Sequence, residues 1–197
     1  SINPNIEKLY DTLIFIAAKT KNWNQLILLS DKAFSNKIIS KIDLNENKSI
    51  GYYEIAKIKY ENDIKDALKN ILKALDLKKN FVPYVKLHLE IISNLNEKRN
   101  LQKLIKKYWN LNPSSLLRSV IIKILNENNI TDLKIINEII KNNPNFDESK
   151  KLLIYFSIKN LKWDIARENI AGMIGINPTK DICYFMSDIE LGENNDK

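Results

Sequence analysis

The dipeptide Asn-Pro recurs in the second half of the chain, at residues 112–113, 143–144 and 177–178. Counting between its prolines gives 31 residues from Pro113 to Pro144 and 34 residues from Pro144 to Pro178. Proline cannot continue a helix, because it lacks the backbone N–H and its ring clashes with the preceding turn. A proline that returns after about 34 residues therefore indicates a repeated helix–turn–helix unit that stacks on its neighbours.

The clearest copy of the second helix in such a unit is the segment 159–178, KNLKWDIARENIAGMIGINP. We interpret Asn160 as its N-cap and Ala166 as the small residue at which two helices touch. Trp163 lies three residues before Ala166, as Trp23 lies three residues before Leu26. The period and these positions are typical of tetratricopeptide (TPR) repeats.

A second clear helix pair lies in the middle of the chain, after a polar stretch at residues 43–49 that we expect to separate it from the preceding unit. Its second helix, capped by Asp63, carries apolar residues at offsets 0, 3, 4, 7, 8 and 11 from Ile64, which trace one helical stripe. Ala67 lies on this stripe and would let the two helices approach closely. Asn145 and Glu148 are spaced as a capping box for a later helix.

The sequence predicts an all-α fold of about eleven helices, arranged as a right-handed α-solenoid of TPR-like repeats. Only four glycines and five prolines interrupt the chain, and 44% of its residues are hydrophobic, enough for a substantial core. We expect one domain over residues 1–197. Its degenerate repeats are expected at about 5–38, 49–80, 81–113, 114–144 and 145–178, with an incomplete last unit at 179–197.

The predicted last helix, residues 181–191, carries the apolar stripe Ile182, Phe185, Met186 and Ile189. A continuing array would cover both sides of this stripe, so we expect it to be partly exposed here and the natural protein to extend past Lys197. The chain also begins at Ser1 rather than Met. We therefore expect it to be a soluble piece of a longer protein.

Composition argues against several functional classes. The net charge of +7 is spread along the chain, and only three of its 31 basic residues are arginine, which favours a compositional bias over nucleic-acid binding. The single histidine, His88, and the single cysteine, Cys183, lack the partners that a metal site or a catalytic thiol needs. Gly172 and Gly175 follow no strand, so they do not indicate a nucleotide loop. We predict no catalytic residue, metal or cofactor.

In a TPR array the first helix of each pair lines the concave face, so side chains on those helices are candidates for partner contact. Lysine and arginine along such a groove would favour an acidic peptide or a terminal carboxylate; a solvated lysine face is the plain alternative. The candidate residues are Tyr53, Lys57, Tyr60, Lys86, Arg118, Lys151 and Tyr155.

The order of three segments resembles the HemY-type proteins, which are TPR proteins of the proteobacterial inner membrane associated with haem biosynthesis. These segments are ALKNILKALDLKKNFVPYVKLHLEII, then Tyr108 and Trp109 with LNPSSLL, then KNLKWDIARENIAGMIGINPTKDICYFMSDIEL. The resemblance covers nearly the whole chain from Trp23 onward. The family's Pro-His-Pro after the tryptophan reads Pro-Ser-Ser at residues 113–115, and several small residues are replaced by Leu or Ile.

The resemblance implies an N-terminal membrane anchor outside this sequence and a TPR region that faces the cytoplasm. It implies no catalytic residue that can be carried over. We therefore expect a non-catalytic scaffold for protein–protein interaction, near haem-pathway enzymes at the bacterial inner membrane. Two alternatives remain open at this point: a haem or porphyrin carrier that uses a tyrosine or His88, and a TPR adaptor unrelated to haem. The partner, the oligomeric state and the side of the membrane are not determined by the sequence.

Overall fold

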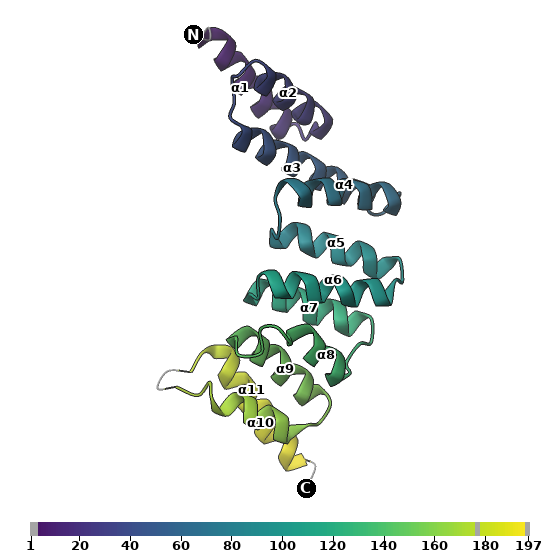
Figure 1. Cartoon of the computed structure of the whole chain (residues 1–197), viewed down its shortest axis with the longest axis vertical. Helices are drawn as coiled ribbons and strands as arrows, with labels where there is room; N and C mark the ends of the chain where they lie inside the picture. The colour runs from purple at the N-terminus through teal and green to yellow at the C-terminus, as the bar shows by residue number, and fades with distance from the viewer. Residues whose placement is uncertain (1–3, 176–177, 196–197) are drawn as a thin grey trace. The chain divides into compact units, whose positions relative to one another are not determined.

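The computed structural model describes residues 4–175 and 178–195, and this part of the chain contains eleven α-helices and no β-strand (Figure 1). The predicted all-α fold with about eleven helices is therefore confirmed. None of the helices in these ranges combines the length and the apolar character that crossing a bilayer demands. Asn177 of the third Asn-Pro dipeptide lies outside the described residues.

The chain divides into two compact units, Ser1–Ile91 and Ile92–Lys197, and the division falls within one helix, α5. Each unit is described here by itself. The predicted single domain, its repeat boundaries and the right-handed course of a solenoid stay predictions. The helices of the first unit and the helix shared between the units are α1 (Pro4–Lys19), α2 (Trp23–Ser35), α3 (Lys41–Lys59), α4 (Ile64–Leu77) and α5 (Val82–Asn94).

The core of the first unit lies largely where α3 and α4 pack together. Asp63 begins α4 by accepting a hydrogen bond from the backbone N–H of Asp66 at 3.0 Å, as the sequence predicted. Ala67 and Ile71 of the predicted stripe are fully buried, and Ala56 faces them from α3 with no exposed surface. Two small residues at the crossing allow the helix axes to approach closely. Leu72, at the edge of the stripe, is exposed.

The polar stretch at residues 43–49 is not a separator, contrary to the sequence prediction, because α3 runs through it from Lys41. Ser40 and Asp43 form a capping box in which each side chain bonds the other residue's backbone N–H, at 3.1 Å in both cases. Only two inward positions of this segment are fully buried, and they hold Leu44 and Ser49. The hydroxyl of Ser49 lies 3.2 Å from that of Tyr84. Because this inward position holds a polar residue, the segment lacks the apolar periodicity that indicates a helix.

The second unit contains six helices in its described residues. Within this unit α6 packs on α8, α8 on α9, α9 on α10 and α10 on α11, and both α7 and α11 also contact α9. Leu101, Ile105, Ile121 and Ile136 are among the fully buried core side chains. These helices are α6 (Lys98–Leu111), α7 (Ser115–Glu127), α8 (Leu133–Ile140), α9 (Asp147–Lys159), α10 (Trp163–Ala171) and α11 (Lys180–Asn195).

One turn recurs in the second unit with the spacing of the repeat. After α7, the N–H of Ile130 bonds the carbonyl of Leu125 at 2.9 Å; after α9, the N–H of Lys162 bonds the carbonyl of Ser157 at 2.9 Å. The residue before each donor, Asn129 or Leu161, has a positive φ, 54° and 56°. This is the left-handed helix ending that satisfies the last carbonyls. The two turns lie 32 residues apart, from Asn129 to Leu161.

Two predicted caps are wrong. Asn160 is the C-cap of α9 rather than the N-cap of α10, which starts after Lys162. Its side-chain amide donates to the carbonyls of Phe156 and Thr131, so it closes α9 and ties its end to the loop between α7 and α8. Asn145 and Glu148 form no capping box, because the N-cap of α9 is Phe146 and the Glu148 carboxylate is used in ion pairs.

The last helix is longer than predicted. α11 continues through the segment after Leu191, as far as Asn195. Ile182 and Ile189 of its stripe are buried in a cluster with Ala166 and Ile170 of α10, and Phe185 packs against the same cluster. Met186 alone of the predicted stripe is exposed. The stripe is therefore partly exposed, as predicted: its two isoleucines are buried and Met186 is open to solvent.

Candidate partner-binding site

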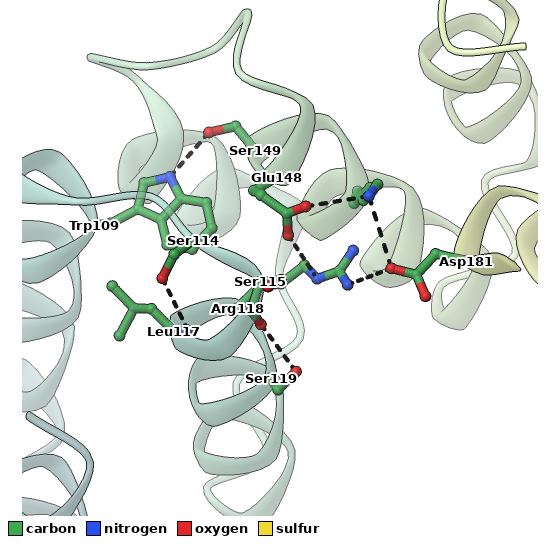
Figure 2. Close-up of polar contacts among 10 residues, drawn as sticks. Trp109, Ser114, Ser115, Leu117, Arg118, Ser119, Glu148, Ser149 and Asp181 are labelled. Atoms are coloured by element: carbon green, nitrogen blue, oxygen red, sulfur yellow. Dashed lines mark hydrogen bonds and ion pairs between the residues drawn. The ribbon is translucent and has the colours of Figure 1, made fainter. Parts of the chain in front are cut away.

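Four charged side chains from three helices of the second unit form one ion-pair cluster (Figure 2). Arg118 of α7 places Nη2 2.6 Å from Oδ2 of Asp181 on α11 and Nε 3.2 Å from Oε2 of Glu148 on α9. Lys151 of α9 places Nζ 3.1 Å from Oε1 of Glu148 and 3.8 Å from Oδ2 of Asp181. We call these four residues the charged cluster. Two cations face two carboxylates, so the cluster is neutral overall.

Burial in the charged cluster falls from its centre to its edge. The side chains of Arg118, Lys151 and Glu148 are 10%, 12% and 19% exposed, whereas that of Asp181 is 43% exposed. The hydrogen bond from Arg118 lowers the pKa of the Asp181 carboxyl despite some desolvation. Nη1 of Arg118 is buried and has no hydrogen-bond partner among the described residues. The cluster therefore links α7, α9 and α11 without satisfying every donor.

A second buried polar contact lies beside the charged cluster. Trp109, on α6, is fully buried, and its indole Nε1–H donates to the Ser149 hydroxyl of α9 at 2.9 Å (Figure 2). Ser114 caps α7 by accepting from the backbone N–H of Leu117 at 3.3 Å. The first contact fixes the start of α9 against α6, and the second begins α7. We read this part of the unit as a structural joint.

Of the predicted contact residues, the structure brings Arg118 and Lys151 together, but it gives both to carboxylates of the chain itself. A ligand carboxylate at this position would have to displace Asp181. Tyr155, also on α9, accepts a hydrogen bond from the Asn126 side chain at 2.8 Å. The predicted residues of the second unit thus already hold partners within the fold.

Four of the predicted residues belong to the first unit. Tyr53 and Lys57 lie on α3, Tyr60 follows the end of α3, and Lys86 lies on α5. Tyr53 stacks on Tyr84 with ring centroids 4.7 Å apart, and Lys57 Nζ lies 5.4 Å from the Tyr53 ring centroid. Burial is the main cause that raises the pKa of the Tyr53 phenol. Tyr60 is half-buried as the C-cap of α3. Lys57 and Lys86 pair within their own helices, with Glu54 and Glu90 at 3.1 and 4.0 Å.

A groove between α6 and α8 is the feature that the sequence reasoning missed. It has a volume of about 400 Å³. Its cations are Arg99, Lys103 and Lys106 from α6 and Lys134 from α8, and Ile135 and Ile139 supply its apolar floor. Gln102 and Glu138 complete the lining. We call it the α6–α8 groove. A signal was present in the sequence: α6, KRNLQKLIKKYWNL, holds five basic residues and no acidic one.

The α6–α8 groove carries a net positive charge: four cations minus one carboxylate leaves three. Lys106 Nζ lies 2.8 Å from Glu138 Oε2, which joins the two helices across the groove. That hydrogen bond is the main cause that lowers the pKa of the Glu138 carboxyl. Among the described residues, no carboxylate lies within ion-pair distance of Arg99, Lys103 or Lys134. Unlike the charged cluster, the groove is not neutralised by the fold.

The remaining residues weighed from the sequence have structural positions. His88 is 4% exposed on α5, where the sequence favoured a structural or surface histidine. Cys183 is exposed on α11 as a free thiol. Gly172 is the C-cap of α10. In the described residues, no group of three or more His, Cys, Asp or Glu side chains is placed to hold a metal ion.

Comparison with protein-family models and with curated proteins found no match for this chain.

Proposed function

We propose that the protein is a non-catalytic helical-repeat scaffold that binds other proteins. The observation that supports this proposal is the recurrence of the same helix-ending turn at Asn129 and Leu161, 32 residues apart, in a unit whose helices pack on one another in pairs. Stacked helix pairs present extended surfaces, and proteins of this construction use those surfaces to bind partners. The charged cluster of the second unit supports a structural role rather than a catalytic one, because both of its cations are already paired with carboxylates of the chain.

The finer part of the proposal is that the partners are haem-pathway enzymes at the bacterial inner membrane, reached through an N-terminal anchor. It rests on the resemblance of the three segments to HemY-type proteins. A generic adaptor role has the same physical support from the fold. A haem carrier that uses His88 is disfavoured, because a side chain 4% exposed cannot reach a ligand without opening α5.

Two measurements test the proposal. Chemical crosslinking and pull-down identify a partner, whose binding to the purified chain is then measured by calorimetry; the scaffold predicts saturable, stoichiometric binding. Titration with haem, followed at the Soret band, tests the carrier. Saturable one-to-one haem binding that is lost in a folded His88→Ala variant, without any protein partner, would replace the scaffold by the carrier.

A further inference from the structure

The α6–α8 groove combines an apolar floor with a rim of cations that the fold leaves uncompensated. Arg99, Lys103 and Lys106 recur at offsets 0, 4 and 7 on α6, so they share one face of that helix. Lys134 faces them from α8, and Ile135 and Ile139 lie between. Repulsion among like charges disfavours such a cluster unless something compensates it. Glu138 pairs with Lys106 alone among the groove cations, and it also pairs with Lys141 outside the groove, at 3.6 Å.

The placement of Arg99 goes against the electrostatics of its own helix. The N-terminal end of an α-helix carries a partial positive charge and favours acidic side chains in its first turn. α6 begins instead with Lys98 and Arg99, and no acidic residue lies in that turn. The preceding Glu97 makes no capping hydrogen bond to the helix; its carboxylate accepts from the Asn100 side chain at 2.8 Å. Violations of local rules of this kind are concentrated at functional sites.

From these observations we propose that the α6–α8 groove binds an acidic amphipathic helix of a partner protein. The carboxylates of such a helix would pair with Arg99, Lys103 and Lys134, and its apolar side chains would cover Ile135, which is half-buried in the lining. This inference rests on the proposed scaffold function and names the chemistry of its partner. A helix laid in a groove is a common mode of peptide recognition, read through apolar anchors at helical spacing.

The groove fits this partner better than it fits nucleic acid or an anionic membrane. None of its lining residues is aromatic, so no base-stacking platform is present, and only one of its four cations is an arginine. Glu138 lies within the lining and would repel a continuous row of phosphates. A flat bilayer surface would meet the rim cations but would leave the recessed apolar floor uncovered.

The test uses the full 197-residue chain and a fluorescein-labelled 14-residue peptide, the length of α6, built from Glu and Leu with the leucines on one helical face. A scrambled peptide of the same composition removes the apolar face and keeps the charge. Lys103→Glu reverses a groove cation. Lys107→Glu is the matched control, because Lys107 is exposed on the same helix but does not line the groove. Circular dichroism checks that each variant is folded.

Fluorescence anisotropy should show saturable binding of the amphipathic peptide, with weaker binding of the scramble. Lys103→Glu should weaken binding by about tenfold and Lys107→Glu by less than about threefold, since close cations act most strongly on a bound carboxylate. Ile135→Gln should reduce the preference for the amphipathic peptide over the scramble while leaving the salt dependence unchanged.

Equal binding of the two peptides, or equal effects of the two charge reversals, would overturn the inference. So would binding of phosphatidylserine vesicles or single-stranded RNA that is lost in Lys103→Glu while the peptide does not bind. A protein partner that binds the wild type and Lys103→Glu equally would also overturn the groove assignment, but it would leave the scaffold function standing. Absence of any protein partner would instead count against the scaffold.

Discussion

The charged cluster makes a quantitative prediction about Arg118. The variant Arg118→Met keeps the aliphatic length of the side chain and removes the guanidinium. Loss of one partner from a fully buried ion pair destabilises a protein by about 3–5 kcal/mol, whereas exposed pairs contribute about 0.2–1 kcal/mol. The Arg118–Glu148 pair is close to the buried case, because its side chains are 10% and 19% exposed. The Arg118–Asp181 pair is closer to the exposed case, because the Asp181 side chain is 43% exposed.

Two features of the cluster lower the expected cost. Glu148 keeps Lys151 at 3.1 Å after the substitution, so it is not left without a cation. The substitution also removes Nη1 of Arg118, a buried donor without a hydrogen-bond partner. We therefore expect Arg118→Met to lower the free energy of unfolding by about 2 kcal/mol, which corresponds to roughly 4–8 °C in Tm for a chain of this size.

Double-mutant cycles measured by urea unfolding separate the two ion pairs of Arg118. The coupling of Arg118→Met with Glu148→Gln should be about 1–2 kcal/mol, because both side chains are shielded from water. The coupling with Asp181→Asn should be below about 1 kcal/mol and should fall at high salt, since solvent ions screen an exposed carboxylate. A larger coupling to Asp181 than to Glu148, or no loss of stability in Arg118→Met, would refute the reasoning.

Three further predictions concern packing and pH. Ala67→Leu and Ala166→Leu place larger side chains at fully buried helix crossings and should each cost about 1–3 kcal/mol of unfolding free energy in urea titrations. Gly51→Ala puts a methyl group 2.7 Å from Ile27 Cγ1, so a net loss of stability is expected despite the better helix propensity of alanine. Combining Gly51→Ala with Ile27→Ala removes the clash and should recover most of the lost stability. The pKa of Asp181 is lowered in the fold, so its contribution is present at neutral pH and is lost as the pH falls through that depressed value; Asp181→Asn should flatten the acid limb of the stability profile, and an unchanged limb would contradict the ion pair.

Helical class and helix number were predictable because they depend on local patterns. The stripe from Ile64 and the cap at Asp63 are encoded within a few residues; the structure has the cap at Asp63 and buries Ala67, Ile71 and Leu75 of the stripe. Local patterns failed where a long-range contact decides a residue's role. Glu148 has the spacing of a capping box, yet Arg118, thirty residues earlier, holds its carboxylate. Ser49 has the local surroundings of a loop residue in the sequence, but in the fold its hydroxyl lies 3.2 Å from that of Tyr84, which is 35 residues away.

The candidate site was predictable only in part for the same reason. Arg118 and Lys151 were predicted from their place on first helices, and they do lie together. No local pattern indicates that Asp181, on a distant helix, pairs with both. The α6–α8 groove was overlooked because its cations come from second helices. The run of basic residues in α6 was visible, but its meaning depends on Lys134 and Ile135 from α8.

Site-specific photo-crosslinking tests the central claim, a protein-binding scaffold that uses the α6–α8 groove, most directly. Benzoylphenylalanine replaces Gln102, which lines the groove, or Asn137, which is exposed on α8 outside it. The chain is irradiated with its captured partner, and the crosslinked peptides are sequenced by mass spectrometry. We expect crosslinks from position 102 to an acidic, helical segment of the partner, and few from position 137. Crosslinks from position 137 alone, or to a segment without acidic residues, would contradict the claim.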